Sequence, residues 1–531
     1  MKKKVVVIGS GLSAIGAIRA LVELGYKPIV IDVALGLDPS LAKKMDLLSR
    51  KKPVDWSDEE RRSLSENPSA SNEKGIPRKL LFGSDFFYGD SSIDAPIIAD
   101  GDMPPFSYAK GGLSEAWGAA SLPPSDSDLD DWPEEARNMD IYISKLLENL
   151  PYSAVDDGIS LDFPILNSRP AALKNSAADS VILSTLERRV KLEKGRFLFG
   201  QARLLVYSGD SISSERSCKY CGNCMGGCVF GSIYKASSEI DELIKNNLID
   251  YLPGSLVDEV KEDGDSVTVF YYNDEHRLSV SADKVYLAAG AVNSTRIVMN
   301  SRKSKRSVRL KSRGGYLVPL FSFKTLPISW PETNTQPGVF LELNGGFLKK
   351  WVHVQVSSEN ELFYARLRFN GKENGLIGRV KGFLLSHVAI AFVNFHSDYG
   401  PEYELTRTEN TSEKPILLSR KIAASGYRRN ALVSVMRLAV KLIPCGLVPM
   451  FPVLVENGGS YHVGGTLPMK EHPSGEFETD VLGRLSCWKN IHVVDTSTFP
   501  SLPGTSIGLA TMANAMRIVF SSFKSENDLS T

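Results

Sequence analysis

The sequence predicts an α/β protein: a domain with a parallel sheet, joined to a second, α+β domain built on an antiparallel sheet. Two patterns predict it. The first is a strand–helix–strand unit at the start of the chain, residues 5–32, with another buried strand at 285–291. The second is a series of strand-like runs separated by turns between residues 316 and 396, which is typical of an antiparallel sheet.

The opening unit begins with Val5–Ile8, a run of β-branched residues that predicts a strand buried on both faces. Apolar residues then recur at helical spacing over 15–24, and Gly25 ends this helix. A second strand covers 28–31 and ends in Asp32. A strand, helix and strand in this order predict a Rossmann-type unit.

The turn between the first strand and the helix has the pattern G-x-G-x-x-A, at Gly9, Gly11 and Ala14. Gly9 permits a tight turn, Gly11 lets the backbone approach a pyrophosphate, and Ala14 keeps the helix close to the sheet. The helix N-terminus then offers free N–H groups to the phosphates. Asp32 is placed to accept hydrogen bonds from a ribose diol. These features predict a dinucleotide site, but this unit does not choose between FAD and NAD.

Size and charge limit the classes of function. The chain has 531 residues, room for two to four domains, and 62 basic against 62 acidic residues. A net charge of zero argues against nucleic acid as the main partner. No uninterrupted apolar stretch reaches membrane-spanning length, and the apolar run after residues 1–4 is a strand rather than an export signal. We therefore expect a cytoplasmic protein.

Other segments are less specific. Residues 38–72 are polar and predict a solvated insertion or flexible surface loop. Residues 108–118 combine paired glycines with a hydroxyl residue, which suits backbone laid against a flat ring or phosphate, or a simple glycine turn. A hairpin is expected at 268–281, with strands 268–272 and 276–281. The expected strands of the antiparallel sheet are 317–323, 339–343, 351–356, 362–369 and 383–395.

Two helices are expected near the C-terminus. The helix over 432–443 contains Arg437 and Lys441 among apolar residues, and suits a core or lid position or, less readily, a membrane surface. The last helix, 510–520, follows Gly504-Thr505-Ser506, a candidate second anion-binding helix end.

Four of the six cysteines are crowded into eleven residues, with the spacing of bacterial ferredoxins and Val229 in place of the usual proline. In a reducing compartment this cluster indicates metal or redox chemistry before disulfides. An iron–sulfur cluster ranks first, zinc second, and metal-free thiols stay open. The candidate metal ligands are Cys218, Cys221, Cys224 and Cys228.

Several pieces in order along the chain resemble the glucose–methanol–choline (GMC) family of flavoprotein oxidoreductases. They are the N-terminal turn with Asp32, the Gly111–Ser114 segment with Trp117, and the strand 287–291. The C-terminal pieces are His462-x-x-Gly465-Thr466, Asp480-x-x-Gly483-Arg484 and Asp495-x-Ser497-x-Phe499-Pro500. The match spans nearly the whole chain.

The resemblance implies extended FAD, with its adenosine near Asp32, its pyrophosphate at Gly9 and Gly11, and its flavin end near Asp495. It also implies that Gly112, Ser114 and Trp117 line the isoalloxazine ring. The full set of candidate cofactor-binding residues is Gly9, Gly11, Ala14, Asp32, Gly112, Ser114, Trp117, Val257, Ala289, Gly290, Asp495 and Thr505.

The candidate catalytic base is His462, which is flanked by glycines and which the resemblance implies lies beside the flavin N5. A neutral imidazole is the natural base near pH 7. Many family members carry a second His or Asn at the start of the last helix, and here that position aligns with Ile507. Ser506 or Thr505 is the candidate substitute, and a site without a second catalytic group also stays open. Of the other histidines, His276, His353, His396 and His472 are expected at the surface or in loops.

The resulting hypothesis is an FAD-dependent alcohol dehydrogenase or oxidase, acting on a CH–OH group of a sugar-like or other small-molecule alcohol. A cysteine-bound cluster would pass electrons to an acceptor protein or a quinone. A flavin-dependent isomerase or epimerase and a catalytically inactive scaffold are the alternatives. The expected FAD-binding domain covers 1–35, about 75–310 and about 456–531, including a Cys-rich segment at 215–235, and the expected substrate domain covers about 311–455.

Overall fold

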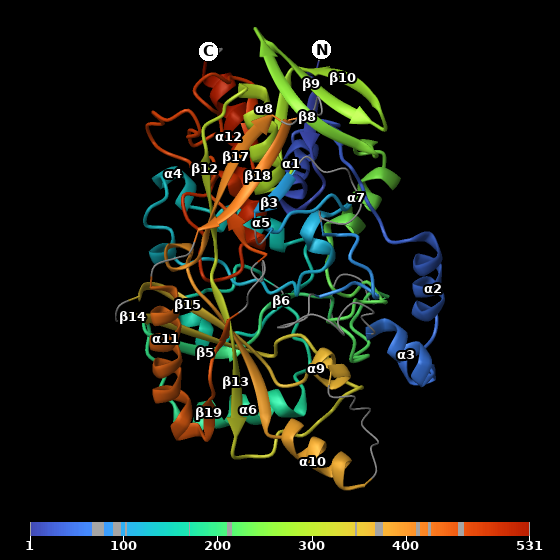
Figure 1. Cartoon of the computed structure of the whole chain (residues 1–531), viewed down its shortest axis with the longest axis vertical. Coiled ribbons are helices and arrows are strands. Elements are labelled where there is room, and N and C mark those ends of the chain that lie inside the picture. The colour runs from blue at the N-terminus through green and yellow to red at the C-terminus, as the bar shows by residue number, and fades with distance from the viewer. Residues whose placement is uncertain are drawn as a thin grey trace.

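Two large sheets of different type lie in the two halves of the molecule (Figure 1). The computed structural model describes residues 2–65, 79–88, 97–100, 103–168, 170–209, 215–345, 348–366, 375–409, 415–422, 426–454 and 461–529. Helices α1, α8 and α12, which pack on the parallel sheet, are labelled in the upper half of Figure 1, and the labelled strands of the seven-stranded sheet lie in the lower half.

The parallel sheet has five strands in the order β22-β11-β1-β2-β7, and every neighbouring pair is parallel. Their bounds are β1 Val5–Ile8, β2 Ile29–Ile31, β7 Asp250–Leu252, β11 Lys284–Leu287 and β22 Ile491–Val493. All four residues of β1 are buried, because Val5 and Val7 pack under α1 and α12 while Val6 and Ile8 face α8. The predicted strand buried on both faces is confirmed.

Helices α1 (Leu12–Glu23) and α12 (Gly508–Leu529) pack closely on one face of this sheet. A Cβ atom added at Gly16 would lie 2.1 Å from the carbonyl oxygen of Met512, so only glycine allows this approach. The opposite face is covered by α8 (Ala291–Arg302) and by a three-stranded antiparallel sheet. That sheet contains the predicted hairpin, as β9 (Ser266–Asn273) and β10 (His276–Ala282), with β8 (Ser255–Asp263) as its third strand.

The large antiparallel sheet has the order β19-β13-β16-β15-β14-β5, with β20 also paired to β13. Its strands are β5 Phe197–Gln201, β13 Gly315–Ser322, β14 Val339–Gly345, β15 Leu348–Ser357, β16 Val388–Asn394, β19 Leu447–Pro449 and β20 Val453–Leu454. Helices α6 (Ala177–Arg189) and α11 (Tyr427–Leu442) contribute side chains to its hydrophobic core. Strand β5 comes from a part of the chain that precedes the other strands by more than a hundred residues.

A further five-stranded sheet, β21-β12-β17-β18-β3, contains strands from both halves of the sequence. Its strands are β3 Ile97–Asp100, β12 Val308–Ser312, β17 Glu402–Glu409, β18 Pro415–Ile422 and β21 Val463–Gly464. Strand β21 directly follows His462 and pairs with Ser312, so this sheet holds the candidate base in place. A small two-stranded sheet joins β4 (Tyr152–Ser153) to β6 (Leu204–Leu205).

The remaining helices connect these sheets. They are α2 Pro39–Ser49, α3 Asp58–Ser65, α4 Glu134–Arg137, α5 Asp140–Leu147, α7 Ala236–Lys245, α9 Glu361–Arg366 and α10 Leu376–Leu385. The 3-10 turns are η1 Pro53–Asp55, η2 Gly112–Glu115, η3 Asp126–Asp128, η4 Gly158–Leu161, η5 Ser397–Tyr399, η6 Ile443–Cys445 and η7 Thr496–Thr498.

Three local predictions were wrong. A flexible loop, one of the two alternatives for 38–72, is wrong: the described part forms α2 and α3 and buries Met45, Leu48 and Trp56 on one side. Most of its other side chains are exposed, as the alternative of a solvated insertion predicts, and residues 66–72 lie outside the described part. The strand expected at 362–369 is helix α9 as far as Arg366, and the rest lies outside the described residues. The strand expected at 383–395 begins only at Val388, because α10 runs to Leu385. Short apolar runs do not distinguish a helix from a buried strand.

Candidate active site

The turn after β1 is fixed by its glycines. Gly9 has φ of +101°, and a Cβ atom there would lie 2.5 Å from the carbonyl oxygen of Ala288 at the end of β11. Gly11 has an ordinary φ of −73° and is the last residue before α1. A Cβ atom at Gly11 would come no closer than 3.9 Å to any atom, here the carbonyl oxygen of Gly111. Gly9 is therefore required by the fold, whereas the space beside Gly11 is left open for another molecule.

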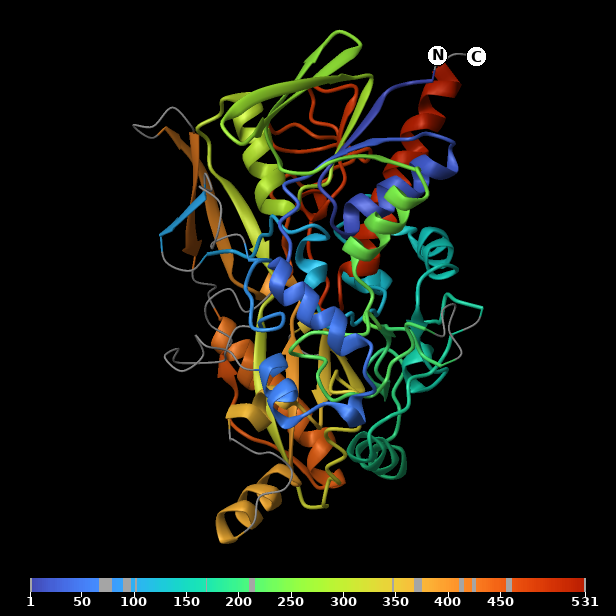
Figure 2. The same ribbon diagram turned by 90° about the vertical axis from the view of Figure 1, so that its right-hand side faces the viewer.

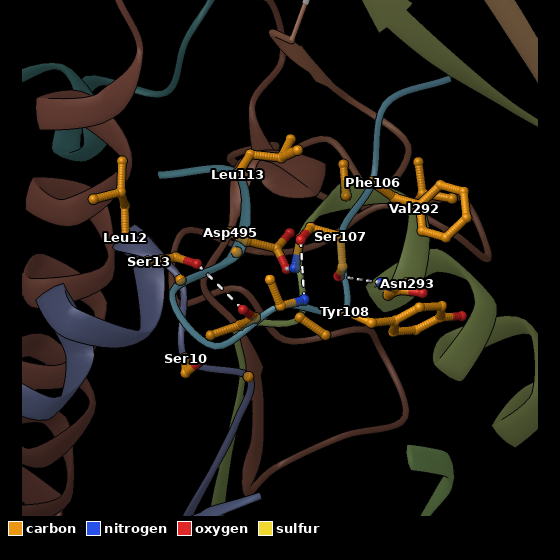
Figure 3. A pocket seen from close by; sticks show the side chains of 18 of the residues that line it. Ser10, Leu12, Ser13, Phe106, Ser107, Tyr108, Leu113, Val292, Asn293 and Asp495 are labelled. Atoms are coloured by element: carbon orange, nitrogen blue, oxygen red, sulfur yellow. Dashed lines mark hydrogen bonds between the residues drawn. The ribbon is translucent and has the colours of Figure 1, made fainter. Parts of the chain in front are cut away.

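The start of α1 lines the cavity. Gly11, the N-cap residue, offers no side chain to the first N–H groups of the helix, and no acidic residue lies in the first turn. Ala14 is fully buried against the sheet. Ser13 donates to the carbonyl oxygen of Ala288 at 3.4 Å (Figure 3). This is the arrangement in which a helix N-terminus holds an anion.

Asp32 lies at the end of β2 and lines the same cavity. One of its carboxylate oxygens, Oδ2, accepts hydrogen bonds from Ser10 Oγ at 2.5 Å and from the hydroxyl of Tyr251 at 2.8 Å. Burial raises the pKa of Asp32 to about 6. Ser10 in turn accepts from the backbone N–H of Gly111 at 2.9 Å, so the two glycine turns are held together.

Residues 111–117 pass next to the turn formed by Gly9–Gly11. Gly111 has φ of +85°, and a Cβ atom there would lie 2.6 Å from the backbone nitrogen of Ser237. Gly112 lies against Gly11, with 3.5 Å from its ideal Cβ position to the Cα atom of Gly11. Ser114 donates to the carbonyl oxygen of Gly111 at 2.6 Å and accepts from the N–H of Ala236 at 3.0 Å. Its hydroxyl therefore braces the loop.

Trp117 closes one side of the cavity near the start of α12. Its indole N–H donates to the carbonyl oxygen of Tyr234 at 2.7 Å, and its ring covers Gly508, where a Cβ atom would lie 2.6 Å from the ring. The flat ring is thus fixed in place beside the cavity that Gly112 and Ser114 also line.

Asp495 also lines the cavity. Its Oδ2 accepts from the backbone N–H of Gly290 at 2.9 Å and from the hydroxyl of Ser294, and its Oδ1 accepts from Ser497 Oγ at 2.6 Å. Burial raises the pKa of Asp495. Val257, Ala289 and Gly290 line the cavity next to it. Figure 3 shows the Asp495 carboxylate between the first turn and the start of α8.

Several lining residues were not predicted from the sequence. They come from α8, from the segment before Lys110 and from α12, and are Ser107, Tyr108, Asn293, Arg296 and Thr511. Asn293 donates to the carbonyl oxygen of Ser107 at 3.3 Å (Figure 3). Their position after a strand of the parallel sheet was the available signal for Asn293 and Arg296, because ligands bind at the carboxyl ends of such strands. Tyr108 begins the segment 108–118 that the sequence indicated, although its side chain was not singled out, and nothing in the local pattern marks Ser107.

The cavity contains polar atoms that suit a bound cofactor. Asn293 Oδ1, Arg296 Nε, the Tyr108 hydroxyl and Thr511 Oγ1 are buried and have no hydrogen-bond partner in the described part of the chain. Leaving such atoms unpaired costs free energy, so they indicate a ligand that pairs with them. The elongated lining from Asp32 through Gly11 and Gly290 to His462 fits an extended dinucleotide.

His462 reaches the same cavity from the other half of the sequence. Its backbone oxygen accepts from the N–H of Arg313 at 3.0 Å. Desolvation, with a further contribution from the positive charge of Arg313, holds the pKa of the His462 imidazole well below its ordinary value. The ring is therefore neutral at physiological pH, as a general base must be.

The candidates for a second catalytic group lie just before α12. Ile507 lines the cavity. The Ser506 hydroxyl accepts a hydrogen bond from the backbone N–H of Leu122 at 3.2 Å. Thr505 has its backbone oxygen bonded to Arg313 at 3.0 Å, and its hydroxyl is buried without a partner in the described residues. Arg313 thus connects the strand that carries His462 to the turn that carries Ser506.

Two histidines expected at the surface or in loops are fully buried. His353 on β15 bonds through Nδ1 to Glu342 Oε1 at 2.6 Å, and burial lowers the pKa of His353 and raises that of Glu342. His396 lies within 3.3 Å of the carbonyl oxygen of Asp128. The expectation of a surface or loop position was wrong for His353, because β15 is a central strand of its sheet. His396 is buried but lies in the loop between β16 and η5, as one of the two alternatives held. His276 and His472 are exposed, as expected.

The four clustered cysteines lie near one another, packed against the segment around Asn334. Asn334 lies 3.8 Å from Cys218 Sγ and 3.5 Å from Cys224 Sγ. Cys218 and Cys228 accept backbone N–H groups at 3.4 and 3.1 Å. Burial raises the pKa of Cys218 to about 11 and that of Cys224 far above its ordinary value. Among the described residues, no group of three or more His, Cys, Asp or Glu is arranged to hold a metal ion, so the metal prediction gains no support.

The comparisons with known proteins agree with the fold. No family model matches the chain, and no curated protein has a detectably similar sequence. The solved structure of pyridoxine 4-oxidase from Mesorbium loti is similar over 98% of this chain and 99% of that one, with a TM-score of 0.58 and 14% sequence identity. The chain has the GMC oxidoreductase fold. The fold class predicted from the sequence, a Rossmann-type domain with a second α+β domain, is thereby confirmed.

In the described part of the chain, every helix is too short or too polar to cross a membrane.

Proposed function

We propose that the protein is an FAD-dependent oxidoreductase that oxidises a CH–OH group of a small-molecule alcohol. One observation carries this proposal. A single cavity is lined by the glycine turn after β1, by Asp32, by Asp495 and by His462, although these residues come from opposite ends of the sequence. The fold shared with pyridoxine 4-oxidase, whose name describes the oxidation of pyridoxine at its position 4, supports it.

The roles proposed for the cavity residues follow their positions. Gly9 and Gly11 hold the pyrophosphate at the start of α1, Ala14 keeps that helix close to the sheet, and Asp32 holds the ribose. Val257, Ala289, Gly290 and Asp495 line the middle of the cavity. Gly112, Ser114 and Trp117 form the flavin end of the cavity. Thr505 is the remaining proposed cofactor-binding residue, two residues before Ile507, which lines the cavity.

The proposed chemistry needs one proton acceptor from the protein. FAD supplies a hydride acceptor when bound. The neutral imidazole of His462 takes the proton of the substrate hydroxyl, because its pKa keeps it unprotonated. Ser506 is the proposed second group. It is not among the described residues that line the cavity but directly precedes Ile507, which is, and its oxygen accepts from Leu122, so its own O–H remains to be donated toward the substrate oxygen.

The test is the substitution His462→Gln in the full-length flavin-loaded protein. We expect flavin content to be unchanged and anaerobic flavin reduction by a reactive alcohol to fall by about 10²–10⁴-fold. His276→Gln, at an exposed position on β10, is the matched control and should leave the rate unchanged. Near-normal flavin reduction by the His462→Gln protein would rule out the imidazole as the base.

Two other functions are distinguished by the same assay. An isomerase or epimerase would convert substrate to product with no acceptor consumed and no lasting flavin reduction. An inactive scaffold would bind FAD and show no reduction with any alcohol in a broad panel. Adding molecular oxygen, a quinone or an acceptor protein to the reduced enzyme then separates oxidase from dehydrogenase, since only an oxidase is reoxidised rapidly by oxygen.

The iron–sulfur cluster stays a prediction from the cysteine spacing alone. Iron and acid-labile sulfide, measured on anaerobically purified protein together with zinc, decide between a cluster, zinc and metal-free thiols. Electron transfer from the flavin to a quinone or acceptor protein through Cys218–Cys228 depends on a positive result.

We also propose the division into domains given by the sequence, with 1–35, about 75–310 and about 456–531 forming the FAD-binding domain and about 311–455 the substrate domain. The exchange of strands between them, with β5 in the seven-stranded sheet and β17 and β18 paired to β12 and β3, suggests that neither folds alone. A cytoplasmic location remains part of the same proposal.

A further inference from the structure

Helix α10 turns its apolar side to solvent. Leu376, Ile377 and Phe383 are 79%, 73% and 58% exposed, and Val380 and Leu384 are each 51% exposed. Gly378 is the one buried residue of this helix. These apolar residues are spaced so that they form one stripe, which a surface helix of a globular protein normally packs against the core. Both views place α10 at the end of the molecule away from the parallel sheet (Figure 1 and Figure 2).

Helix α11 has two apolar sides. Its inner side, with Ala431 and Leu438, packs in the core of the seven-stranded sheet. Its outer side carries Leu432, Met436 and Val440, which recur every four residues and are 54%, 61% and 73% exposed. The helix is therefore a core helix, as one of the sequence interpretations held, and it also presents a second apolar stripe outward.

Ring contacts connect α10 with the end of α11. The Phe383 ring lies 4.3 Å from that of His387, which lies 6.1 Å from that of Phe321, which in turn lies 5.7 Å from that of Phe323. Phe323 is 70% exposed, and its N–H donates to the carbonyl oxygen of Gly446, just after α11 and η6. The outer sides of α10 and α11, together with Phe323, are called the apolar end below. A surface this rich in exposed apolar residues marks an interaction site.

The charges on these two helices are all of one sign. Together α10 and α11 contain two and four basic residues and no Asp or Glu. Arg379, Arg428 and Arg429 are exposed. Lys441 forms an ion pair with Glu193. Farther along the same end, Arg189 and Lys324 act electrostatically on Cys445 in η6. A partner for this surface must therefore be apolar with negative charge at its boundary.

A lipid bilayer with anionic headgroups has this chemistry. A second copy of the chain does not, because a symmetric dimer through the apolar end would bring the cations of α10 and α11 against their own copies. Helices with an apolar stripe and basic flanks lie in the plane of the interface, with their apolar side among the acyl chains. Each nearby Lys or Arg strengthens binding to an anionic leaflet.

We propose that the apolar end binds the surface of a bilayer that contains anionic lipid, so that the protein is held at a membrane by α10 and α11 without crossing it. This binding is independent of the reaction proposed for the cavity, and a protein without activity would still show it.

The test is flotation of the full-length flavin-loaded protein with lipid vesicles. One set of vesicles contains phosphatidylcholine alone, and in the other part of it is replaced by phosphatidylglycerol. We expect the protein to float with the anionic vesicles, and this binding to weaken as salt is raised, because salt screens the headgroup charge.

Paired variants separate the apolar and electrostatic contributions. Val380→Glu with Phe383→Glu on α10 should reduce binding to anionic vesicles by about tenfold or more. It replaces two exposed apolar side chains, which the bilayer would bury, with charges of the same sign as the lipid headgroups. Met436→Gln with Val440→Gln tests α11 separately, should the first variant fold poorly. Arg379→Gln with Arg429→Gln should weaken binding and remove most of its salt dependence. Ile141→Glu, 67% exposed on α5, is the matched control and should bind normally.

Three results would overturn the proposal. They are no flotation with either type of vesicle, equal loss in the Ile141→Glu control, or a concentration-dependent dimer that Val380→Glu with Phe383→Glu dissociates while the wild type ignores vesicles. Light scattering on each folded variant provides the last of these measurements, and circular dichroism and flavin content establish folding.

Discussion

The hydroxyl of Ser10 donates a hydrogen bond of 2.5 Å to Asp32 Oδ2, and so joins the turn after β1 to the end of β2. The Tyr251 hydroxyl donates to the same oxygen at 2.8 Å. Asp32 is thus held by its own chain on one oxygen, while it lines the cavity in which a ribose is proposed to bind. Burial raises the pKa of this carboxylate to about 6, and its titration is testable.

We predict that Asp32→Asn changes how the stability of the flavin-free protein depends on pH. Burial raises the pKa of Asp32 from 3.8 to about 6. The folded protein therefore binds a proton that the unfolded chain has lost, so ionisation costs stability progressively as pH rises from about 4 to about 6. In the variant this cost is absent, and its stability relative to wild type should rise by about 3 kcal/mol across that range. Urea unfolding at several pH values measures it.

The control for Asp32→Asn is Glu148→Gln, at an exposed position after α5, which should run parallel to wild type. Burial also raises the pKa of Asp128 and that of Asp179 to about 6, so both proteins lose stability in the same pH range. Only the difference in the free energy of unfolding between variant and wild type is therefore informative. A constant difference over the whole range would show that Asp32 has an ordinary pKa.

Gly9 and Gly11 lie in one turn, but only Gly9 is required by the backbone conformation and by close contacts. A non-glycine residue at this positive φ costs about 1–3 kcal/mol of backbone strain. The close contact of Cβ with the carbonyl oxygen of Ala288 adds to this cost, so Gly9→Ala should destabilise the protein by more than the strain alone. Gly11→Ala should fold with nearly normal stability, because the nearest atom lies 3.9 Å away, yet it should bind FAD much more weakly. Thermal unfolding and fluorescence titration of flavin-free protein with FAD measure the two effects.

If Gly11→Ala bound FAD as tightly as wild type, the open space beside this turn would not be the pyrophosphate site. If Gly9→Ala were as stable as wild type, the contact with β11 would not constrain the turn.

The sequence predicted those parts of the molecule that depend on neighbouring residues, and not those that depend on contacts between distant parts of the chain. The β1–α1–β2 unit was predictable because strand, turn and helix each depend on local residues and agree with one another. Asp32 and His462 were found through motifs. By contrast, Asn293 and Arg296 line the cavity because β11 inserts beside β1, a pairing nearly 280 residues apart that no local pattern encodes.

Burial was the other feature that local pattern could not give. His353 was expected at the surface, yet it is buried because β14 and β16 flank β15 and both faces of the sheet are covered. The apolar residues of α10 show the reverse case: they were interpreted in part as a buried strand, and the chain leaves them exposed. Whether an apolar run is inside or outside depends on what the rest of the chain brings against it.

The pH dependence of turnover follows from His462. Desolvation and Arg313 hold its pKa well below the ordinary value of 6.5, so the ring stays neutral as pH falls through the range in which an ordinary histidine would be protonated. We therefore expect the rate constant of flavin reduction to be nearly constant from about pH 8 to about pH 6. Anaerobic stopped-flow reduction by one alcohol across this range provides the measurement. A loss of half the rate near pH 6.5 would contradict a depressed pKa.

The second catalytic group is decided by Ser506→Ala. The Ser506 hydroxyl accepts from Leu122 N–H at 3.2 Å, and if its own proton is donated to the substrate oxygen, its removal weakens a bond that strengthens as charge develops. We expect flavin reduction to slow by about tenfold or more, while the free energy of unfolding falls by only about 1 kcal/mol for the lost contact with Leu122. Ser153→Ala, which removes a buried hydroxyl on β4 that accepts from the N–H of Leu173 at 2.8 Å, is the matched control and should leave the rate within about twofold of wild type. A Ser506→Ala enzyme that is less stable but equally fast would limit this hydroxyl to bracing Leu122, and would leave His462 as the sole proton-transfer group proposed for the cavity.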